Sequence, residues 1–282
     1  MLILTEKPSV AKDFAKALGC NFSSADKCFK SADGSIFITN CVGHLFELNE
    51  PAAYNPEFKS WKKLPVIPEQ FHYHVSPELK DAARIVVGLL KNHKNDEILI
   101  ATDADREGEI IARECLKAVG ISDTSRIKRF WVSQALTPAV IKGGISEAKA
   151  LGNYDLLSEQ GFARQHSDWL VGINGTRFIT NKAGTLFPVG RVQTAVLSAI
   201  SDRCLAIKNF VPEKYYEIFG EFNPPNGAKI KGVYVDSAGN TKLKDTTLAV
   251  ELERFINSPA KCLEVKAEKK EILPPQLYSL ND

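Results

Sequence analysis

The sequence predicts an α/β fold in which a mostly parallel sheet is followed by a helical segment and a β-rich region. Two short apolar runs, residues 2–5 and 97–102, each precede a pattern of helical spacing, as buried strands do in a sheet covered by helices. After residue 210 the pattern changes to strand-like alternation between turn residues. The sequence therefore divides into residues 1–148, 149–210 and 211–282.

The first apolar run predicts a strand, and the residues behind it predict a helix. Ser9 is a candidate N-cap for a helix that reaches Leu18, and Gly19 ends that helix. Glu6 and Lys7 therefore lie at the carboxyl end of the first strand.

The second apolar run predicts another strand, followed by a helix on which Ile111, Cys115 and Val119 form one stripe. Between the strand and this stripe lies the acidic turn, DADREGE at residues 103–109. In an open α/β sheet such turns lie at the carboxyl ends of the strands, where ligands bind.

Carboxylates so close together repel one another unless protons or a hard cation neutralise them. Mg²⁺ is the usual cation, held by one or two carboxylates and by substrate phosphates. The alternative is an acidic helix N-terminus favoured by the helix dipole, but the position behind a buried strand favours the metal site. If the two strands are parallel neighbours, Glu6 faces the acidic turn, and Glu6 and Lys7 suit phosphoryl transfer. Taken alone, they would be an ordinary surface pair.

Further elements are predicted between and after these two strands. Residues 37–42 and 129–133 are strand candidates, and a helix begins at Pro138 with Thr137 as its cap. Residues 51–77 contain five prolines, which indicates an irregular connection over the surface.

Residues 149–208 carry helical patterns. Arg164 and Asp168 lie four apart on one face, so they can pair, either to support the helix or to face a ligand. A last helix is predicted to begin at Arg191, with Val192 on its inner face. Its first turn offers free N–H groups and the positive end of a dipole, which predicts a phosphate site unless these residues only face water.

The last part of the chain reads as β-rich. Residues 215–222, 229–235 and 260–266 alternate like strands, and residues 246–256 are predicted to be helical.

Composition limits the classes of protein. Hydrophobic residues make up 44% and charged residues 25% of the chain, as in globular proteins. The formal net charge is only +2, so any basic surface that binds nucleic acid must be local. The six cysteines are scattered without a Cys-x-x-Cys motif, which argues against zinc and for reduced, mostly buried thiols in a cytoplasm. No secretory signal or apolar run of membrane-spanning length is present.

Five motifs carry a resemblance to a known family. EKPS at residues 6–9 and the acidic turn resemble the Toprim domain, which occurs in type IA and type II topoisomerases, bacterial primases and some nucleases. CVGHLFEL at 41–48, ARQHSDWL at 163–170 and VGRVQT at 189–194 resemble the type IA DNA topoisomerases, most of all the bacterial topoisomerase III branch. The motifs run in the family's order, and fainter similarity continues to the end of the chain.

The resemblance implies a Rossmann-like Toprim domain at 1–148, a partial helical domain with a DNA groove at 149–210, and a partial β-rich arch at 211–282. It also implies a catalytic set in which Mg²⁺ is the cofactor, Lys7 stabilises charge on the scissile phosphate and Glu6 assists proton transfer. The metal ligands in this set would be Asp103 and Asp105 with Glu6 or Glu107.

The resemblance further implies contacts with a single DNA strand. His44 would contact DNA or be structural, and Trp61 and Trp169 would stack on bases or belong to the core. The candidate DNA-binding residues are His44, Trp61, Arg164, Asp168, Trp169, Arg177, Lys182, Val189, Gly190, Arg191, Val192, Gln193 and Thr194. The expected partner is single-stranded or negatively supercoiled DNA, bound by a cytoplasmic, nucleoid-associated monomer.

Members of this family cut one strand with a tyrosine in a Tyr-Pro-Arg-Thr-Asp-like context. No such context occurs in this sequence, and Tyr278 is not assigned as the nucleophile. We therefore expect an amino-terminal fragment that binds Mg²⁺ and single strands without cleaving them. The alternatives are a Toprim nuclease or primase-like enzyme, and a non-catalytic module that binds single-stranded DNA.

Overall fold

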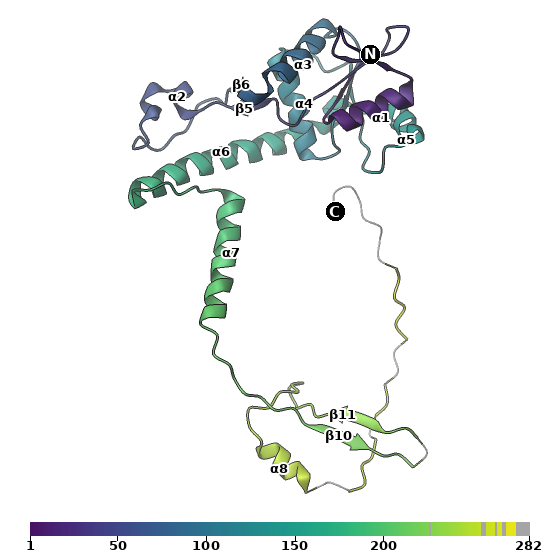
Figure 1. Cartoon of the computed structure of the whole chain (residues 1–282), viewed down its shortest axis with the longest axis vertical. Coiled ribbons are helices and arrows are strands. Elements are labelled where there is room, and N and C mark those ends of the chain that lie inside the picture. Colours follow the sequence, from purple (N-terminus) through teal and green to yellow (C-terminus); the bar gives the residue numbers. More distant parts are fainter. Residues whose placement is uncertain (226, 255–257, 263, 267–268, 275–282) are drawn as a thin grey trace. The chain divides into compact units, whose positions relative to one another are not determined.

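The computed structural model describes residues 1–225, 227–254, 258–262, 264–266 and 269–274. These residues form two compact units, one of residues 1–198 and one that starts at residue 199 (Figure 1). In chain order the elements are β1 (Leu2–Thr5), α1 (Pro8–Leu18), β2 (Asn21–Ser23), β3 (Cys28–Lys30), β4 (Phe37–Asn40), β5 (Phe46–Leu48), α2 (Pro51–Tyr54), η1 (Pro56–Lys59), β6 (Tyr73–Val75), η2 (Pro77–Leu79), α3 (Lys80–Asn92), β7 (Ile98–Ala101), α4 (Arg106–Ala118), β8 (Ile127–Arg129), α5 (Pro138–Ser146), β9 (Lys149–Ala150), η3 (Leu151–Tyr154), α6 (Asp155–Ala183), α7 (Arg191–Lys208), β10 (Phe219–Phe222), β11 (Ile230–Val233) and α8 (Thr247–Glu253).

The main sheet of the first unit has a parallel centre and antiparallel edges. Within the described residues its order is β2-β3-β4-β1-β7-β8-β9. β1 is parallel to both β4 and β7, and β7 is parallel to β8, whereas the pairs β2–β3, β3–β4 and β8–β9 are antiparallel. Because Thr5 is opposite Ala101, the segments after β1 and β7 leave the sheet side by side at the same edge.

Helices cover both faces of this sheet. Leu2, Leu4 and Ile100 pack with α3 and α4 on one face, whereas Ile3 and Leu99 pack with α1 and α5 on the other (Figure 1). Successive residues of β1 and β7 thus point to opposite faces, and both faces are buried. This explains why the two strands read as continuous apolar runs rather than as alternating patterns.

The long helix α6 packs closely against α4. A Cβ at Gly161 would lie 2.3 Å from Cγ2 of Ile110, so only glycine permits this approach. The close contact places the middle of α6 beside the helix that follows the acidic turn.

The second unit is smaller. β10 and β11 form an antiparallel pair, Tyr216 forms an isolated bridge with Leu243, and α8 follows. The predicted strands at 215–222 and 229–235 are thus present in shortened form. Residues 260–262 and 264–266, where a third strand was expected, are not in a strand.

Two boundary predictions in the first unit were wrong. Ser9 does not cap α1, because Pro8 is already its first residue and Lys7 occupies the capping position; proline suits a first helical position, where no N–H is needed. Of the strand expected at 129–133, only Arg129 lies in a strand, because β8 is Ile127–Arg129. The strand has only one apolar residue, Ile127, and its last residue, Arg129, is buried.

The connection at residues 51–77 is more ordered than predicted. It contains the short helices α2 and η1, and β6 returns to pair antiparallel with β5. In contrast, Thr137 caps α5 as predicted, accepting a hydrogen bond from the Val140 N–H. Tyr278 lies outside the described residues.

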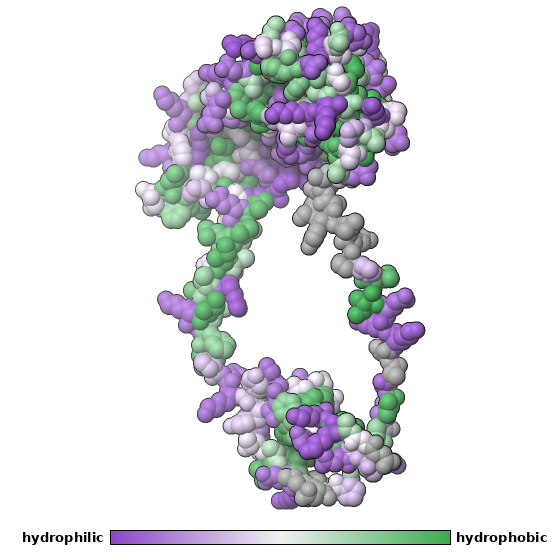
Figure 2. Space-filling model, turned by 45° about the vertical axis from the view of Figure 1, so that its right-hand side comes forward, coloured by the Kyte–Doolittle hydropathy of each residue, from purple (hydrophilic) through white to green (hydrophobic). Residues whose placement is uncertain are grey.

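The predicted inner face of α7 is not covered by the described residues. Val192, Val196 and Ile200 are all exposed, and the helix shows as a largely hydrophobic surface in Figure 2. Helical periodicity predicted the helix itself but not what packs on it. Among the described residues, no helix combines the length and apolar character needed to cross a bilayer.

Candidate nucleic-acid and metal site

Because β1 and β7 are parallel neighbours, their ends bring Glu6 and the acidic turn together. The N–H of Asp103 donates a 3.1 Å hydrogen bond to Oε2 of Glu6. Burial first, and then the charge of Asp103, raise the pKa of the Glu6 carboxyl. Carboxylates from two strands therefore share one small region in which negative charge is disfavoured.

Lys7 lies over the same carboxylates. Its Nζ is 2.5 Å from Oδ2 of Asp103 and 3.9 Å from Oε1 of Glu6. The hydrogen bond to Asp103 raises the pKa of Lys7, so the ammonium form is favoured. Lys7 is more than half exposed, which leaves its positive charge accessible to an anionic ligand.

The other two acids of the predicted metal set point to protein groups. Asp105 caps α4, because its Oδ1 accepts a 2.7 Å hydrogen bond from the Gly108 N–H. Oε1 of Glu107 lies 2.8 Å from Nε2 of His44. Gly108 is necessary for this turn, since a Cβ there would lie 2.3 Å from the carbonyl oxygen of Asp103.

His44 lies between two carboxylates. Its Nδ1 is 2.9 Å from Oε2 of the buried Glu114, and its Nε2 contacts Glu107. The hydrogen bond with Glu114, opposed by burial, raises the pKa of His44 to about 9, so the ring is an imidazolium at neutral pH. Its geometry supports a structural role at the acidic turn.

Glu114 also joins α4 to α6. Its Oε1 accepts a 2.7 Å hydrogen bond from Gln165 Nε2, and Oε1 of Gln165 accepts one from the Tyr73 hydroxyl at 2.8 Å. A hydrogen-bonded path therefore runs from the acidic turn through α4 and α6 to β6.

The residues fit a hard cation by the chemistry of their donors. Glu6, Asp103 and Asp105 supply the carboxylate oxygens that Mg²⁺ prefers. Burial first, and then the negative charge of Asp103, raise the pKa of Glu6, and a bound cation would oppose both effects. Within the described part of the chain, however, no three His, Cys, Asp or Glu residues are gathered as a ready metal site. The acids instead bond to Lys7, His44 and backbone N–H groups, which partly neutralise them.

A second group of charged residues forms an arginine pocket, lined by Arg106, Arg164, Arg191 and Val192 with a volume of about 470 Å³. Asp168 lies between two of these arginines, with its Oδ1 2.6 Å from Nε of Arg191 and its Oδ2 3.7 Å from Nε of Arg164. The predicted Arg164–Asp168 pair is thus confirmed, and Asp168 pairs with both arginines. Because Arg106 is the first residue of α4, the pocket begins directly beside the acidic turn.

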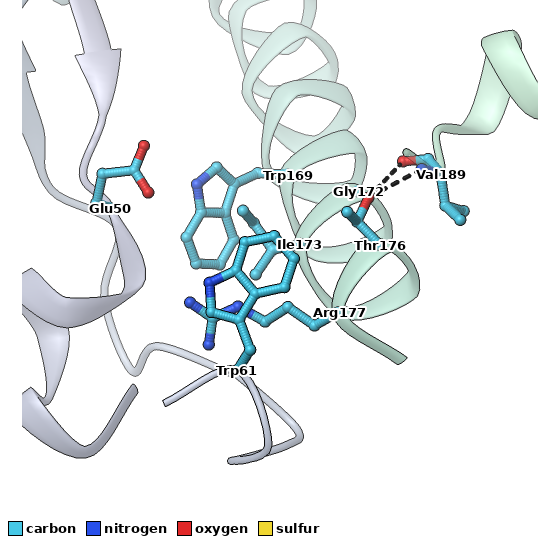
Figure 3. A pocket seen from close by; sticks show the side chains of 8 residues that line it. All are labelled: Glu50, Trp61, Trp169, Gly172, Ile173, Thr176, Arg177 and Val189. Carbon is cyan, nitrogen blue, oxygen red and sulfur yellow. Dashed lines mark hydrogen bonds between the residues drawn. The ribbon is translucent and has the colours of Figure 1, made fainter. Parts of the chain in front are cut away.

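A tryptophan pocket of about 290 Å³ lies between α6 and the segment that contains η1. Its lining residues are Glu50, Trp61, Trp169, Gly172, Ile173, Thr176, Arg177 and Val189 (Figure 3). The guanidinium of Arg177 lies over the Trp61 ring, 5.6 Å from its centroid, and Trp169 packs edge-on against Tyr54 and Phe71. Both tryptophans therefore line a pocket rather than the closed core.

The segment before α7 is held against α6. The Val189 N–H donates to the Thr176 hydroxyl at 2.9 Å, and the Gly190 N–H donates to Oγ1 of Thr194 at 3.0 Å, so this N–H is not free for a ligand. Gln193 is exposed. Lys182 lies near the end of α6, with its Nζ 5.8 Å from the centre of the Phe178 ring.

Comparison with known proteins agrees with this arrangement. A family model described as the Toprim domain matches residues 1–135, and one described as DNA topoisomerase matches residues 153–282. Residues 1–135 thus belong to the Toprim family, and residues 153–282 belong to the DNA topoisomerase family.

Relatives in this family are similar along the whole chain. A DNA topoisomerase 3 of Shouchella clausii is 34% identical over 99% of this chain, and one of Staphylococcus epidermidis is 35% identical over 100% of it. This chain spans 38% of the length of each. Full-length topoisomerase I of Thermotoga maritima has the same fold over 89% of this chain and 37% of its own, with a TM-score of 0.60 and 22% identity.

Sequence reasoning missed four charged or polar residues that organise the site. Arg129 and Glu109 are fully buried and paired at 2.9 Å, and Glu114 and Gln165 form the link described above. The available signal was a charged residue at an inward position of a strand or on the apolar side of a helix. Charged residues are seldom buried, so a charged residue at such a position is a signal. The residues that pair with it are far away in the sequence, so the signal does not identify them.

Proposed function

We propose that this chain provides the metal-binding and strand-binding part of a type IA DNA topoisomerase. Such an enzyme changes DNA topology by Mg²⁺-dependent, ATP-independent cleavage, passage and religation of a single strand, and acts on DNA at the nucleoid. The observation that carries the proposal is the meeting of Glu6 and Lys7 from β1 with Asp103 and Asp105 from β7 at one edge of the sheet.

In this proposal Asp103 and Asp105, with Glu6 or Glu107, hold Mg²⁺. The ion would supply positive charge where negative charge develops on the scissile phosphate, a contribution of several kcal/mol in metal sites generally. The acids that the chain's own groups now engage would then turn to the cation.

Lys7 and Glu6 have separate roles in the proposal. The accessible ammonium of Lys7 would bind an oxygen of the scissile phosphate and stabilise its charge. The carboxyl of Glu6 would hold the proton that passes to the leaving oxygen at cleavage, and would take it back at religation.

The strand would follow the arginine pocket and the tryptophan pocket, which residues 149–210 line together with Arg106, Glu50 and Trp61. Arg164 and Arg191 of the arginine pocket would neutralise phosphates, whereas Trp61 and Trp169 would stack on bases. Arg177 and Lys182 would extend the phosphate contacts. We propose the domain boundaries after residues 148 and 210 on this division of labour.

The decisive test is a denaturing gel of an end-labelled single-stranded oligonucleotide incubated with the 282-residue chain and Mg²⁺, with a native gel alongside. No tyrosine in the sequence stands in the family's cleavage context, so we expect intact DNA that shifts on the native gel. Shortened, protein-free DNA would instead indicate a nuclease. DNA attached to protein would show that these residues contain a nucleophile, and the absence of any shift would contradict strand binding.

The metal assignment has its own test. Asp103→Ala combined with Asp105→Ala should abolish Mg²⁺ binding in calorimetry while circular dichroism stays unchanged. Asp81→Ala combined with Asp96→Ala, at two exposed surface acids, is the matched control and should bind Mg²⁺ as the wild type does. Unchanged binding in the first variant would mean that the metal site lies elsewhere.

A further inference from the structure

Arg129 lies directly beneath the acidic turn and directs its donors at the end of β7. Its Nη1 donates to the carbonyl oxygens of Thr102 at 2.7 Å and Phe130 at 2.9 Å, and its Nη2 donates to that of Asp103 at 2.6 Å. The planar guanidinium thus fixes two consecutive carbonyl groups from which the acidic turn departs. A lysine has only a point-like ammonium and cannot reproduce this fork.

Glu109 fixes Arg129 in turn. Its Oε2 lies 2.9 Å from Nε of Arg129, and its Oε1 accepts a 2.8 Å hydrogen bond from Nε of Arg113. Arg113 also donates to the carbonyl oxygen of Leu151, just before α6. Both oxygens of Glu109 are therefore used, and Arg129 has no freedom to rotate away from the turn.

Stability alone is a poor explanation for this arrangement. Both Arg129 and Glu109 are fully buried, and removing two charges from water offsets most of their attraction, so an apolar pair of similar volume often stabilises a core as well. What an apolar pair cannot do is hold the carbonyls of Thr102 and Asp103. Groups that orient the ligands of a metal site commonly change its affinity when they are replaced.

We propose that Arg129, held by Glu109, is a positioning residue that fixes the start of the acidic turn and so keeps Asp103 against Glu6 and Lys7. The consequence for metal binding rests on the proposed function, whereas the effect on the turn itself does not. Neither residue touches a substrate in this assignment; both act through the backbone of residues 102–103.

The test compares the full chain with Arg129→Lys and with a control that loses stability elsewhere. Leu90→Ala removes a fully buried side chain of α3, so it lowers the melting temperature without touching the turn. Two quantities are measured well below each melting temperature: Mg²⁺ affinity by calorimetry, and hydrogen–deuterium exchange of a peptide that covers residues 102–109. Glu109→Gln serves as a second variant, since it removes the charge but keeps the shape.

We expect Arg129→Lys to weaken Mg²⁺ binding about 10- to 100-fold and to speed exchange in residues 102–109, with Glu109→Gln changing both quantities in the same direction. Leu90→Ala should change neither, even if it melts at a lower temperature. Unchanged exchange in both turn variants, or equal losses in Leu90→Ala, would overturn the positioning role. A wild-type chain without Mg²⁺ affinity would instead contradict the proposed function, and the exchange measurement would still decide the role of Arg129.

Discussion

The ammonium of Lys7 pairs with the carboxylate of Asp103 across the neighbouring strands β1 and β7, with 2.5 Å between Nζ and Oδ2. These residues are 96 positions apart in the sequence. The pair places the chain's own cation on an acid that the proposed metal also uses, so Lys7 and Mg²⁺ should compete for Asp103.

Lys7→Met should therefore raise Mg²⁺ affinity. Removing one nearby positive charge in a partly exposed site is worth about 1 kcal/mol, or about fivefold in affinity. Calorimetry at constant ionic strength measures the effect. Lys12→Met, on the exposed side of α1, is the control and should leave affinity unchanged. A weaker or equal affinity in Lys7→Met would contradict the competition.

The raised pKa of His44 predicts a pH-dependent stability. The folded-state pKa of about 9 lies above the ordinary value of 6.5, so the imidazolium stabilises the fold fully below pH 6.5 and this contribution is lost as the pH rises through 9. We expect a loss of about 2 kcal/mol that is absent in His44→Asn. Urea denaturation from pH 6 to pH 10 measures it. His72→Asn, at an exposed histidine, should follow the wild-type profile.

Substitutions in the arginine pocket should reduce the salt dependence of strand binding. Arg164→Gln and Arg191→Gln each remove one proposed phosphate contact, so each should lower the log–log salt slope by about 0.7. Fluorescence anisotropy with a labelled oligonucleotide over a range of salt concentrations measures the slope. Arg84→Gln, at an exposed arginine of α3, should leave it unchanged. A slope that is equal in all variants would remove these arginines from the DNA interface.

Substitutions in the tryptophan pocket should weaken binding without changing the salt slope. Trp61→Ala or Trp169→Ala should cost about 1–3 kcal/mol of strand affinity, because base–aromatic stacking has that magnitude. Trp131→Ala is the matched control, since Trp131 stacks on Tyr154 and lines neither pocket. The same anisotropy titration measures all three. Equal strand affinity in the pocket variants and the wild type would contradict base stacking and support a structural role for both tryptophans.

Gly108→Ala should disrupt the acidic turn. The added Cβ would meet the carbonyl oxygen of Asp103 at 2.3 Å, and such overpacking costs about 1–3 kcal/mol. Gly88→Ala in α3 is the opposite case, because no atom lies within 4 Å of its added Cβ and alanine favours a helix by up to about 1 kcal/mol. Thermal unfolding should thus show opposite shifts for the two variants.

Local patterns in the sequence were sufficient for the elements that carry the site. The apolar runs predicted β1 and β7, and the turn that follows β7 was predicted from its acids and the helical stripe behind them. The type of each element followed from residues within a few positions of one another. The strand predicted at 129–133 was misplaced, because the apolar residues lie at 130–132 whereas β8 is Ile127–Arg129 and contains one apolar residue.

The sequence by itself determined the family, the strand-to-turn-to-helix units and the identity of the acids at the sheet edge, since all of these depend on short segments. Only the tertiary structure decided that Arg129 and Glu109 lie beneath the acidic turn, that His44 lies between Glu107 and Glu114, and that Trp61 meets Arg177. The reason is physical: a buried charge is tolerated only beside its partner, and these partners come from elements that the chain brings together only when it folds.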